Sequence, residues 1–95
     1  MPEALNLASR VRISPEVVSE ELDGETVLLH MRTGIYYGLD QVGTTIWRLL
    51  RSNLSLEDVL DELLSEYEVC REECAGDLLR VVNEMRDLEL VELQA

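Results

Sequence analysis

The residues with the greatest capacity for chemistry in this sequence are two cysteines and one histidine. Cys70 and Cys74 are four residues apart, which places both thiols on one face of a helix but suits an unstrained disulfide poorly. A metal site needs further ligands, and the sole histidine, His30, lies far away in a strand-like segment. We therefore predict no metal and no cofactor, and expect Cys74 to be a small core residue and Cys70 to stand at a helix start.

The carboxylates and glycines also lack the spacing of a catalytic site. Acidic residues repeat along one predicted helix, at Glu57, Asp58, Asp61 and Glu62, as on a solvated helix face. Paired acid/base catalysis needs a pocket around such groups. The glycines are never clustered, which argues against a phosphate-binding loop, and one histidine cannot complete a catalytic triad with these residues. We predict that the chain is not an enzyme and that it acts by binding.

The charge is strongly acidic and unevenly distributed. The formal net charge is −12, and every basic residue is an arginine. Residues 54–95 carry most of this excess, so their surface would repel the phosphate backbone of a nucleic acid. No apolar run approaches the roughly 18 residues of a membrane helix, and the N-terminus lacks the pattern of a signal peptide. The expected partners therefore include no nucleic acid and no membrane, and the expected location is the cytoplasm.

The first half of the chain has the composition of short strands. Residues 1–10 show no period and are expected to be a flexible tail before one domain that spans 11–95. Asp23-Gly24 and Thr33-Gly34 are turn signals between segments rich in strand formers. We predict strands over 11–14, 17–22, 26–32 and 35–39, arranged as a small antiparallel meander.

The second half changes to helical periodicity. Asp40 and Ser55 are placed to cap helices over about 41–51 and 56–67, and a third helix fits about 71–88. Residues 90–93 are expected to be extended. Strands followed by three helices make an α+β domain.

The third predicted helix has an unusually wide apolar surface. Leu78, Val81 and Met85 share one edge of it with Cys74 and Leu88. One edge could line a groove, whose rim would hold Asp77, Arg80 and Glu84; alternatively, the helix is wedged between the sheet and the second helix and buried on both sides.

The segment 35–39 reads IYYGL and is the most distinctive predicted strand. Alternation places Ile35, Tyr37 and Leu39 on one face and Tyr36 and Gly38 on the other. We expect Tyr37 and Leu39 to meet the core, and Gly38 to allow another backbone or side chain to approach closely. Neither Lys nor Pro, which commonly protect an edge strand, occurs between 26 and 39.

The central third of the sequence resembles the PqqD-like family, also called RiPP recognition elements. The family pattern is met by Gly34, Tyr36, Tyr37, Leu39, Asp40, Gly43, Ile46 and Trp47. The resemblance covers residues 18–90, and in the last helix it rests on pattern alone. It implies a winged-helix-like domain of three antiparallel strands followed by three helices.

The resemblance also implies a function and a site. Members bind the leader segment of a ribosomally made precursor peptide, which adds as a strand beside the third strand in a cleft walled by the third helix. The expected peptide-binding residues are Ile35, Tyr36, Tyr37, Gly38, Leu39, Asp77, Leu78, Arg80, Val81, Glu84 and Met85.

Several assignments are compatible with these features. The sequence is more similar to the lasso-peptide group than to the proteins of the pyrroloquinoline quinone pathway. In the lasso-peptide group the leader passes to a separate leader peptidase and an ATP-dependent cyclase, whereas the partner in the pyrroloquinoline quinone pathway is a radical-SAM enzyme. A winged-helix DNA-binding regulator is a different class, disfavoured by the nine acids and one arginine of residues 55–77. A dimerisation or adaptor domain that uses the same apolar strand is a third.

Overall fold

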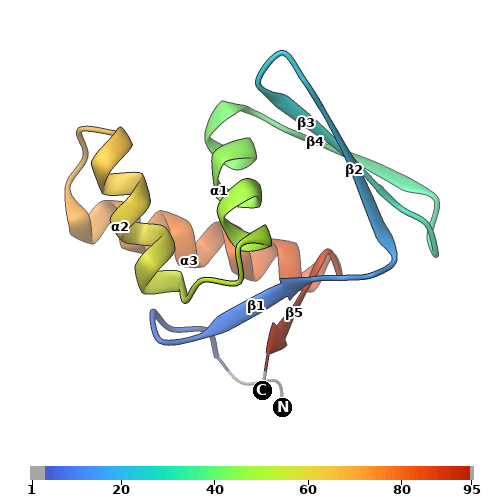
Figure 1. Cartoon of the computed structure of the whole chain (residues 1–95). Helices are drawn as coiled ribbons and strands as arrows, with labels where there is room; N and C mark the ends of the chain where they lie inside the picture. The colour runs from blue at the N-terminus through green and yellow to red at the C-terminus, as the bar shows by residue number, and fades with distance from the viewer. Residues whose placement is uncertain (1–3, 95) are drawn as a thin grey trace.

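The structure is a computed structural model that describes residues 4–94. Its elements follow in the order β1 (Arg10–Ile13), β2 (Val17–Leu22), β3 (Glu25–His30), β4 (Ile35–Leu39), α1 (Gln41–Arg51), α2 (Leu56–Glu66), α3 (Arg71–Asp87) and β5 (Val91–Gln94). The predicted α+β class is confirmed: a three-stranded antiparallel sheet precedes three helices (Figure 1).

The three-stranded sheet has the order β2-β3-β4, and two tight turns connect its consecutive strands. Asp23 and Gly24 both have positive φ, 54° and 81°, as the favoured two-residue hairpin turn requires. The second turn covers residues 31–34, and Gly34, with φ 74°, donates its N–H to the carbonyl of His30 at 2.7 Å. The strand predicted over 26–32 therefore ends at His30.

The first strand does not belong to this meander, which corrects our prediction. β1 pairs with β5, antiparallel, and Val11 stands opposite Leu93. A turn at Ser14, whose carbonyl accepts the N–H of Val17 at 3.1 Å, separates β1 from β2. Val11 is fully buried and Val91 nearly so, because this second sheet closes the core beneath the helices.

Residues 4–9 of the predicted flexible tail make specific contacts. Leu5 is buried, and the backbone carbonyls of Leu7 and Ser9 accept the N–H groups of Glu57 and Leu56 at 2.8 and 2.9 Å. These bonds satisfy donors that the start of a helix leaves unpaired. The first three residues lie outside the described part of the chain.

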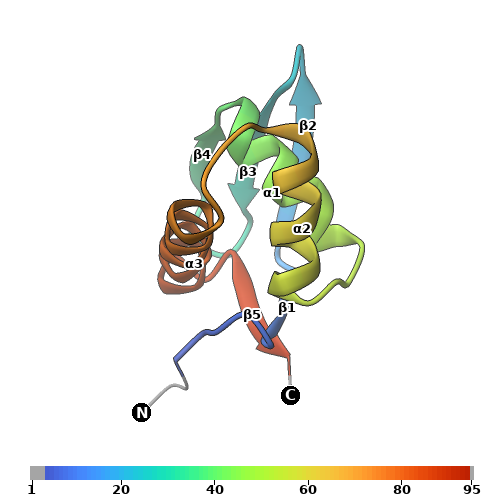
Figure 2. The ribbon, with the colours of Figure 1, turned by 90° about the vertical axis from the view of Figure 1, so that its left-hand side faces the viewer.

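Helix α1 connects the sheet with the other helices (Figures 1 and 2). The predicted cap is present, because the carboxylate of Asp40 accepts the N–H of Gly43 at 2.8 Å. The helix lies on the face of the sheet that carries Leu28, and the hydroxyl of Thr26 bonds that of Thr44 at 2.9 Å. Trp47 is 2% exposed at the centre of the core.

Helix α2 is capped as predicted and packs along α3. The hydroxyl of Ser55 accepts the N–H of Asp58 at 3.2 Å, and the buried positions Val59, Leu60 and Leu63 follow at helical spacing. None of the helices in residues 4–94 is both long and apolar enough to cross a membrane.

Helix α3 ends in a left-handed cap. The N–H groups of Glu89 and Leu90 bond the carbonyls of Arg86 and Met85, each at 2.9 Å, with Glu89 at φ 61°. The chain turns at this cap, so Leu88 is 45% exposed although its predicted phase placed it on the apolar surface.

Candidate functional site

Strand β4 has one unpaired edge. It bonds only to β3 in the sheet order, so within residues 4–94 its other side offers backbone N–H and C=O groups to a further strand. Its alternation is as predicted: Tyr37 and Leu39 pack against the core, whereas Tyr36 is 68% exposed. Gly38 is open, since a Cβ added there would meet no atom within 4 Å.

A cleft of about 600 Å³ begins at the end of β4 and runs between α1 and α3. β4 and α3 lie on the same side of the molecule (Figure 2). The cleft is lined by Gly38, Leu39, Asp40, Val42, Gly43, Ile46, Leu63, Tyr67, Val69, Glu73, Cys74, Asp77, Leu78, Arg80 and Val81.

The floor of the cleft is the top of the hydrophobic core. Ile46, Leu63 and Leu78 are 1–3% exposed. Val42 and Val69 line the same cleft but are 46% and 50% exposed, so each leaves about half of its side chain in contact with water. An apolar surface of this kind gains free energy when a ligand covers it.

Glycine at position 43 permits the close approach that shapes the β4 end of the cleft. A Cβ there would lie 3.2 Å from Cβ of Leu39 and 3.3 Å from the Asp40 carboxylate. Both neighbours would have to shift, so a side chain at this point would press α1 away from the end of β4. At the other side, the Tyr67 hydroxyl lies 3.4 Å from the hydroxyl of Thr45.

The charged side chains lie at the rim of the cleft. Arg80 pairs with Asp77 at 3.7 Å and with Glu84 at 3.4 Å, and all three are well exposed. Ion pairs of this kind contribute little to stability and are readily exchanged for a ligand. With Asp40 and Glu73 also at the rim, the entrance to the cleft has an excess of negative charge.

The cysteines have no catalytic setting among the described residues. Burial, and then the nearby Asp77 carboxylate, raise the pKa of the Cys74 thiol, which favours the unreactive protonated form. Cys70 is exposed at the start of α3, as predicted, and Cys74 is half-buried against the core. His30 is buried on the sheet and does not line the cleft. In residues 4–94 no group of His, Cys, Asp and Glu is arranged to hold a metal ion.

The structure brings together part of the predicted site. Gly38, Leu39, Asp77, Leu78, Arg80 and Val81 line the cleft. The other three predicted residues of β4 do not line the cleft: Ile35, Tyr36 and Tyr37. Glu84 is exposed one helical turn after Arg80 and also lies outside the cleft lining.

Two of the predicted site residues on α3 are buried in the core. Leu78 is 1% exposed and Met85 is 4% exposed, and Met85 does not line the cleft. Around the helix axis both residues are neighbours of Val81, but the side of α3 that carries Leu78 and Met85 faces the core. Leu78 therefore contributes to the floor and Val81 to the wall.

Several cleft residues were absent from our prediction because they lie on α1, at the end of α2 and in the following segment. Val42, Ile46, Tyr67 and Val69 belong to this group. Val42 and Ile46 are one helical turn apart on α1, yet Val42 is half exposed whereas Ile46 is buried. Nothing in the periodicity of the sequence distinguishes a cleft residue from a core residue on the same helix face.

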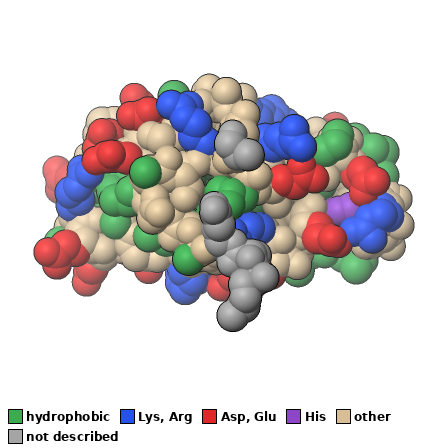
Figure 3. Space-filling model, turned by 90° about the horizontal axis from the view of Figure 1, so that it is seen from below, with side chains coloured by type: hydrophobic (Ala, Val, Ile, Leu, Met, Phe, Trp, Pro, Cys, Tyr) green, Lys and Arg blue, Asp and Glu red, His purple; other side chains and the backbone are tan. Residues whose placement is uncertain are grey.

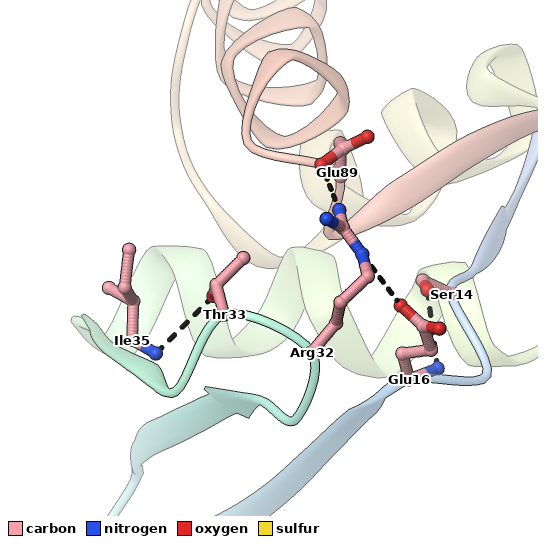
Figure 4. Close-up of polar contacts among 6 residues, drawn as sticks. All are labelled: Ser14, Glu16, Arg32, Thr33, Ile35 and Glu89. Carbon is pink, nitrogen blue, oxygen red and sulfur yellow. Dashed lines mark hydrogen bonds and ion pairs between the residues drawn. The ribbon is translucent and has the colours of Figure 1, made fainter.

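A polar cluster fixes the other end of β4 (Figure 4). Arg32, in the turn before β4, pairs with Glu16 at 3.1 Å and with Glu89 at the end of α3. The pKa of the Arg32 guanidinium is raised above its usual value, and the hydrogen bond to Glu89 makes the largest contribution. Thr33 accepts the N–H of Ile35 at 3.3 Å. These contacts connect the hairpin to α3 and so help set the spacing between β4 and α3.

The sequence matches a known protein family over most of its length. The sequence pattern of the family described as coenzyme PQQ synthesis protein D (PqqD) matches residues 25–91. No curated protein is significantly similar to the chain in sequence.

Two solved structures are similar over nearly their whole length. TbiB1 in complex with the TbiA(beta) leader peptide shares 42% identity, with 88% of this chain and 98% of that chain covered and a TM-score of 0.84. Lasso peptide synthetase B1 complexed with the leader peptide shares 30% identity, with 87% and 98% covered and a TM-score of 0.81.

Proposed function

The chain belongs to the family of coenzyme PQQ synthesis protein D, and from that premise we propose that it captures the leader segment of a ribosomally made precursor peptide in lasso-peptide biosynthesis. The observation that carries the proposal is the unpaired edge of β4, which continues directly into the apolar cleft. Both similar structures hold a leader peptide.

The proposed mode of binding is strand addition. The leader backbone would pair with the free edge of β4, and this pairing would supply affinity that does not depend on the leader's side chains. Because side chains alternate along a strand, one set would point toward the cleft and the other toward the opposite face of the sheet. The half-exposed Val42 and Val69 would then be covered by apolar side chains of the leader.

The domain would act by binding alone and would present the leader to separate enzymes. The partners we propose are a leader peptidase and an ATP-dependent cyclase, in the cytoplasm, with no nucleic acid and no membrane involved. Strand addition and an apolar cleft can hold a peptide in a fixed register without a nucleophile or a metal.

Fluorescence polarisation of a labelled leader, from the precursor encoded beside this gene, tests the proposal. Saturable binding is expected, weakened by Val81→Ala, which shortens the cleft wall. Leu79→Ala is the matched control, because Leu79 is also half-buried on α3 but does not line the cleft. Equal loss in both variants, or no binding to the folded wild-type protein, would contradict it.

Backbone modification of the peptide tests strand addition separately. N-methylation at successive leader positions removes one N–H donor at a time, and an alternating pattern of weakened binding is expected because only every second N–H faces β4. Tyr36→Ala should affect binding less than these changes, since the Tyr36 side chain points away from the cleft. A uniform response to methylation would contradict pairing with β4.

The family match also favours a second candidate, a PqqD-type chaperone that presents a precursor peptide to a radical-SAM enzyme. The same titration with a precursor of that pathway separates the two. We rank it second because both similar structures are leader complexes and one is named as a lasso peptide synthetase.

A further inference from the structure

The face of the sheet that points away from the helices carries an exposed row of apolar side chains. Val18, Leu29 and Tyr36 stand opposite one another across β2, β3 and β4. Val18 is 47% and Tyr36 68% exposed, and the neighbouring Val27 is 42% exposed. Single exposed apolar residues are common, but a continuous row across three strands is typical of an interaction surface. Hydrophobic side chains also gather at this end of the molecule in Figure 3.

The charges on this face differ from those on the covered face. Glu20 and Glu25 are exposed there, and neither is paired with an arginine of residues 4–94. By contrast, Glu21, which points to the helix side, pairs with Arg48. The outer face therefore combines apolar side chains with uncompensated negative charge, which is complementary to an apolar surface flanked by Lys or Arg.

A second copy of this chain does not meet that requirement. In a twofold dimer the same patch faces itself, so Glu20 and Glu25 of both copies would be brought together. Like charges across an interface oppose association, and the chain already has a net charge of −12. The complementary occupant is a different, basic protein surface.

The outer face is continuous with the proposed leader site. In the β3–β4 register Gly38 stands opposite Val27, so the open space beside Gly38 lies on this face. A strand added to β4 would place every second side chain in the same plane, beside Tyr36 and Gly38. A bound leader would thus widen the outer face and fill the gap that glycine leaves.

We propose that the outer face of β2–β4, widened by a bound leader strand, is the surface on which the leader-processing enzyme docks through apolar side chains flanked by Lys or Arg. This inference rests on the proposed function. Docking there leaves the cleft to the leader and lets the enzyme contact the domain and its cargo together, so a loaded domain binds more tightly than an empty one.

Binding of the purified leader peptidase of the same pathway, measured by interferometry on immobilised domain with and without saturating leader, tests the proposal. The double variant Val18→Thr/Val27→Thr keeps β-branched side chains, so the sheet should be retained while the apolar surface is lost. We expect it to weaken docking about tenfold or more. Its leader affinity by fluorescence polarisation should fall much less than its docking, because Val18 is separated from the leader by two strands and neither residue lines the cleft.

A charge-reversal pair tests the stated chemistry of the partner. Glu20→Arg should weaken docking several-fold and flatten its dependence on salt, whereas Glu62→Arg, the same change on an exposed position of α2, should not. Unchanged docking of the threonine double variant would overturn the proposal, as would equal affinity of the loaded and empty domain. A dimer in sedimentation that the double variant disperses would assign the face to a second copy and also overturn it. Absent leader binding in the polarisation assay would instead overturn the proposed function, independently of the docking result.

Discussion

A single substitution at the mouth of the cleft separates leader binding from folding. Val42 is the second residue of α1, 46% exposed, and lines the cleft. The first turn of α1 contains no acidic residue, although the positive end of the helix dipole favours one there. Val42→Glu therefore adds a negative charge that stabilises the start of α1. The same charge opposes the binding of an apolar ligand in the cleft.

The effect on folding should be small because two contributions oppose each other. Half of the valine side chain is already exposed, so its lost burial costs roughly 0.7 kcal/mol, about half of the value for a fully buried valine. An acidic residue in the first turn contributes about 0.3–1 kcal/mol in the opposite direction. We expect the free energy of unfolding to stay within about 1 kcal/mol of the wild type in urea titrations followed by fluorescence of Trp47, the sole tryptophan.

The effect on binding should be large because both contributions have the same sign. The leader can no longer bury the exposed half of the valine, worth roughly 0.7 kcal/mol. It must also remove water from a carboxylate, at a cost of about 1–3 kcal/mol. Together these predict a leader Kd raised by about tenfold or more.

Gln41→Glu is the matched control. Gln41 precedes Val42 in the same helical turn, is exposed and does not line the cleft. The same charge is therefore added without any loss of apolar contact, and leader affinity should change little. Wild-type affinity in the stable Val42→Glu variant would refute the cleft as the leader site. An equal loss in Gln41→Glu would show that long-range charge, rather than desolvation in the cleft, governs binding.

Three further predictions follow from burial, pKa and backbone conformation. Leu78→Ala should lower the free energy of unfolding by about 2–5 kcal/mol, because Leu78 is 1% exposed in the core; a smaller loss in urea titration would contradict that burial. In a Cys70→Ser background, alkylation of Cys74 should require higher pH in the folded protein than in urea, because the raised pKa of the Cys74 thiol lowers its thiolate fraction. Saturating leader should slow the alkylation. Coinciding pH profiles in the folded and unfolded protein would argue against burial of the thiol. Glu89→Gly and Glu89→Gln both remove the ion pair with Arg32, but only glycine relieves the positive φ, so the free energy of unfolding of Glu89→Gly should exceed that of Glu89→Gln by about 0.5–1 kcal/mol. Equal free energies of unfolding in urea titration would contradict strain at this position.

Much of the local structure could be predicted from neighbouring residues. Asp23-Gly24 forms the hairpin turn, and Asp40 and Ser55 cap their helices, because each of these interactions is completed within four residues of chain. The orientation of Tyr37 and Leu39 follows from strict alternation along a strand that is covered on one face. The α+β class follows from the change of period between the two halves of the chain.

The partner of β1 could not be predicted in this way. Arg12 pairs with Glu92, 80 residues away, and the alternation of either strand is compatible with several neighbours. Only closure of the chain around the helices selects the pairing with β5. Likewise, the contacts of Leu7 and Ser9 depend on the unpaired N–H groups at the start of α2, distant donors that the N-terminal sequence does not reveal.

The sequence by itself determined the order of the elements, the caps of α1 and α2, the faces of β4 and the acidic character of the chain, because these depend on side-chain type and on contacts within one or two turns. Only the tertiary structure decided the cleft. It turns Met85 into the core, leaves Val81 in the wall and adds Val42 and Val69 from elements not assigned to the site. The physical reason is that periodicity defines a direction around one helix axis, whereas a cleft is the space left where several elements meet.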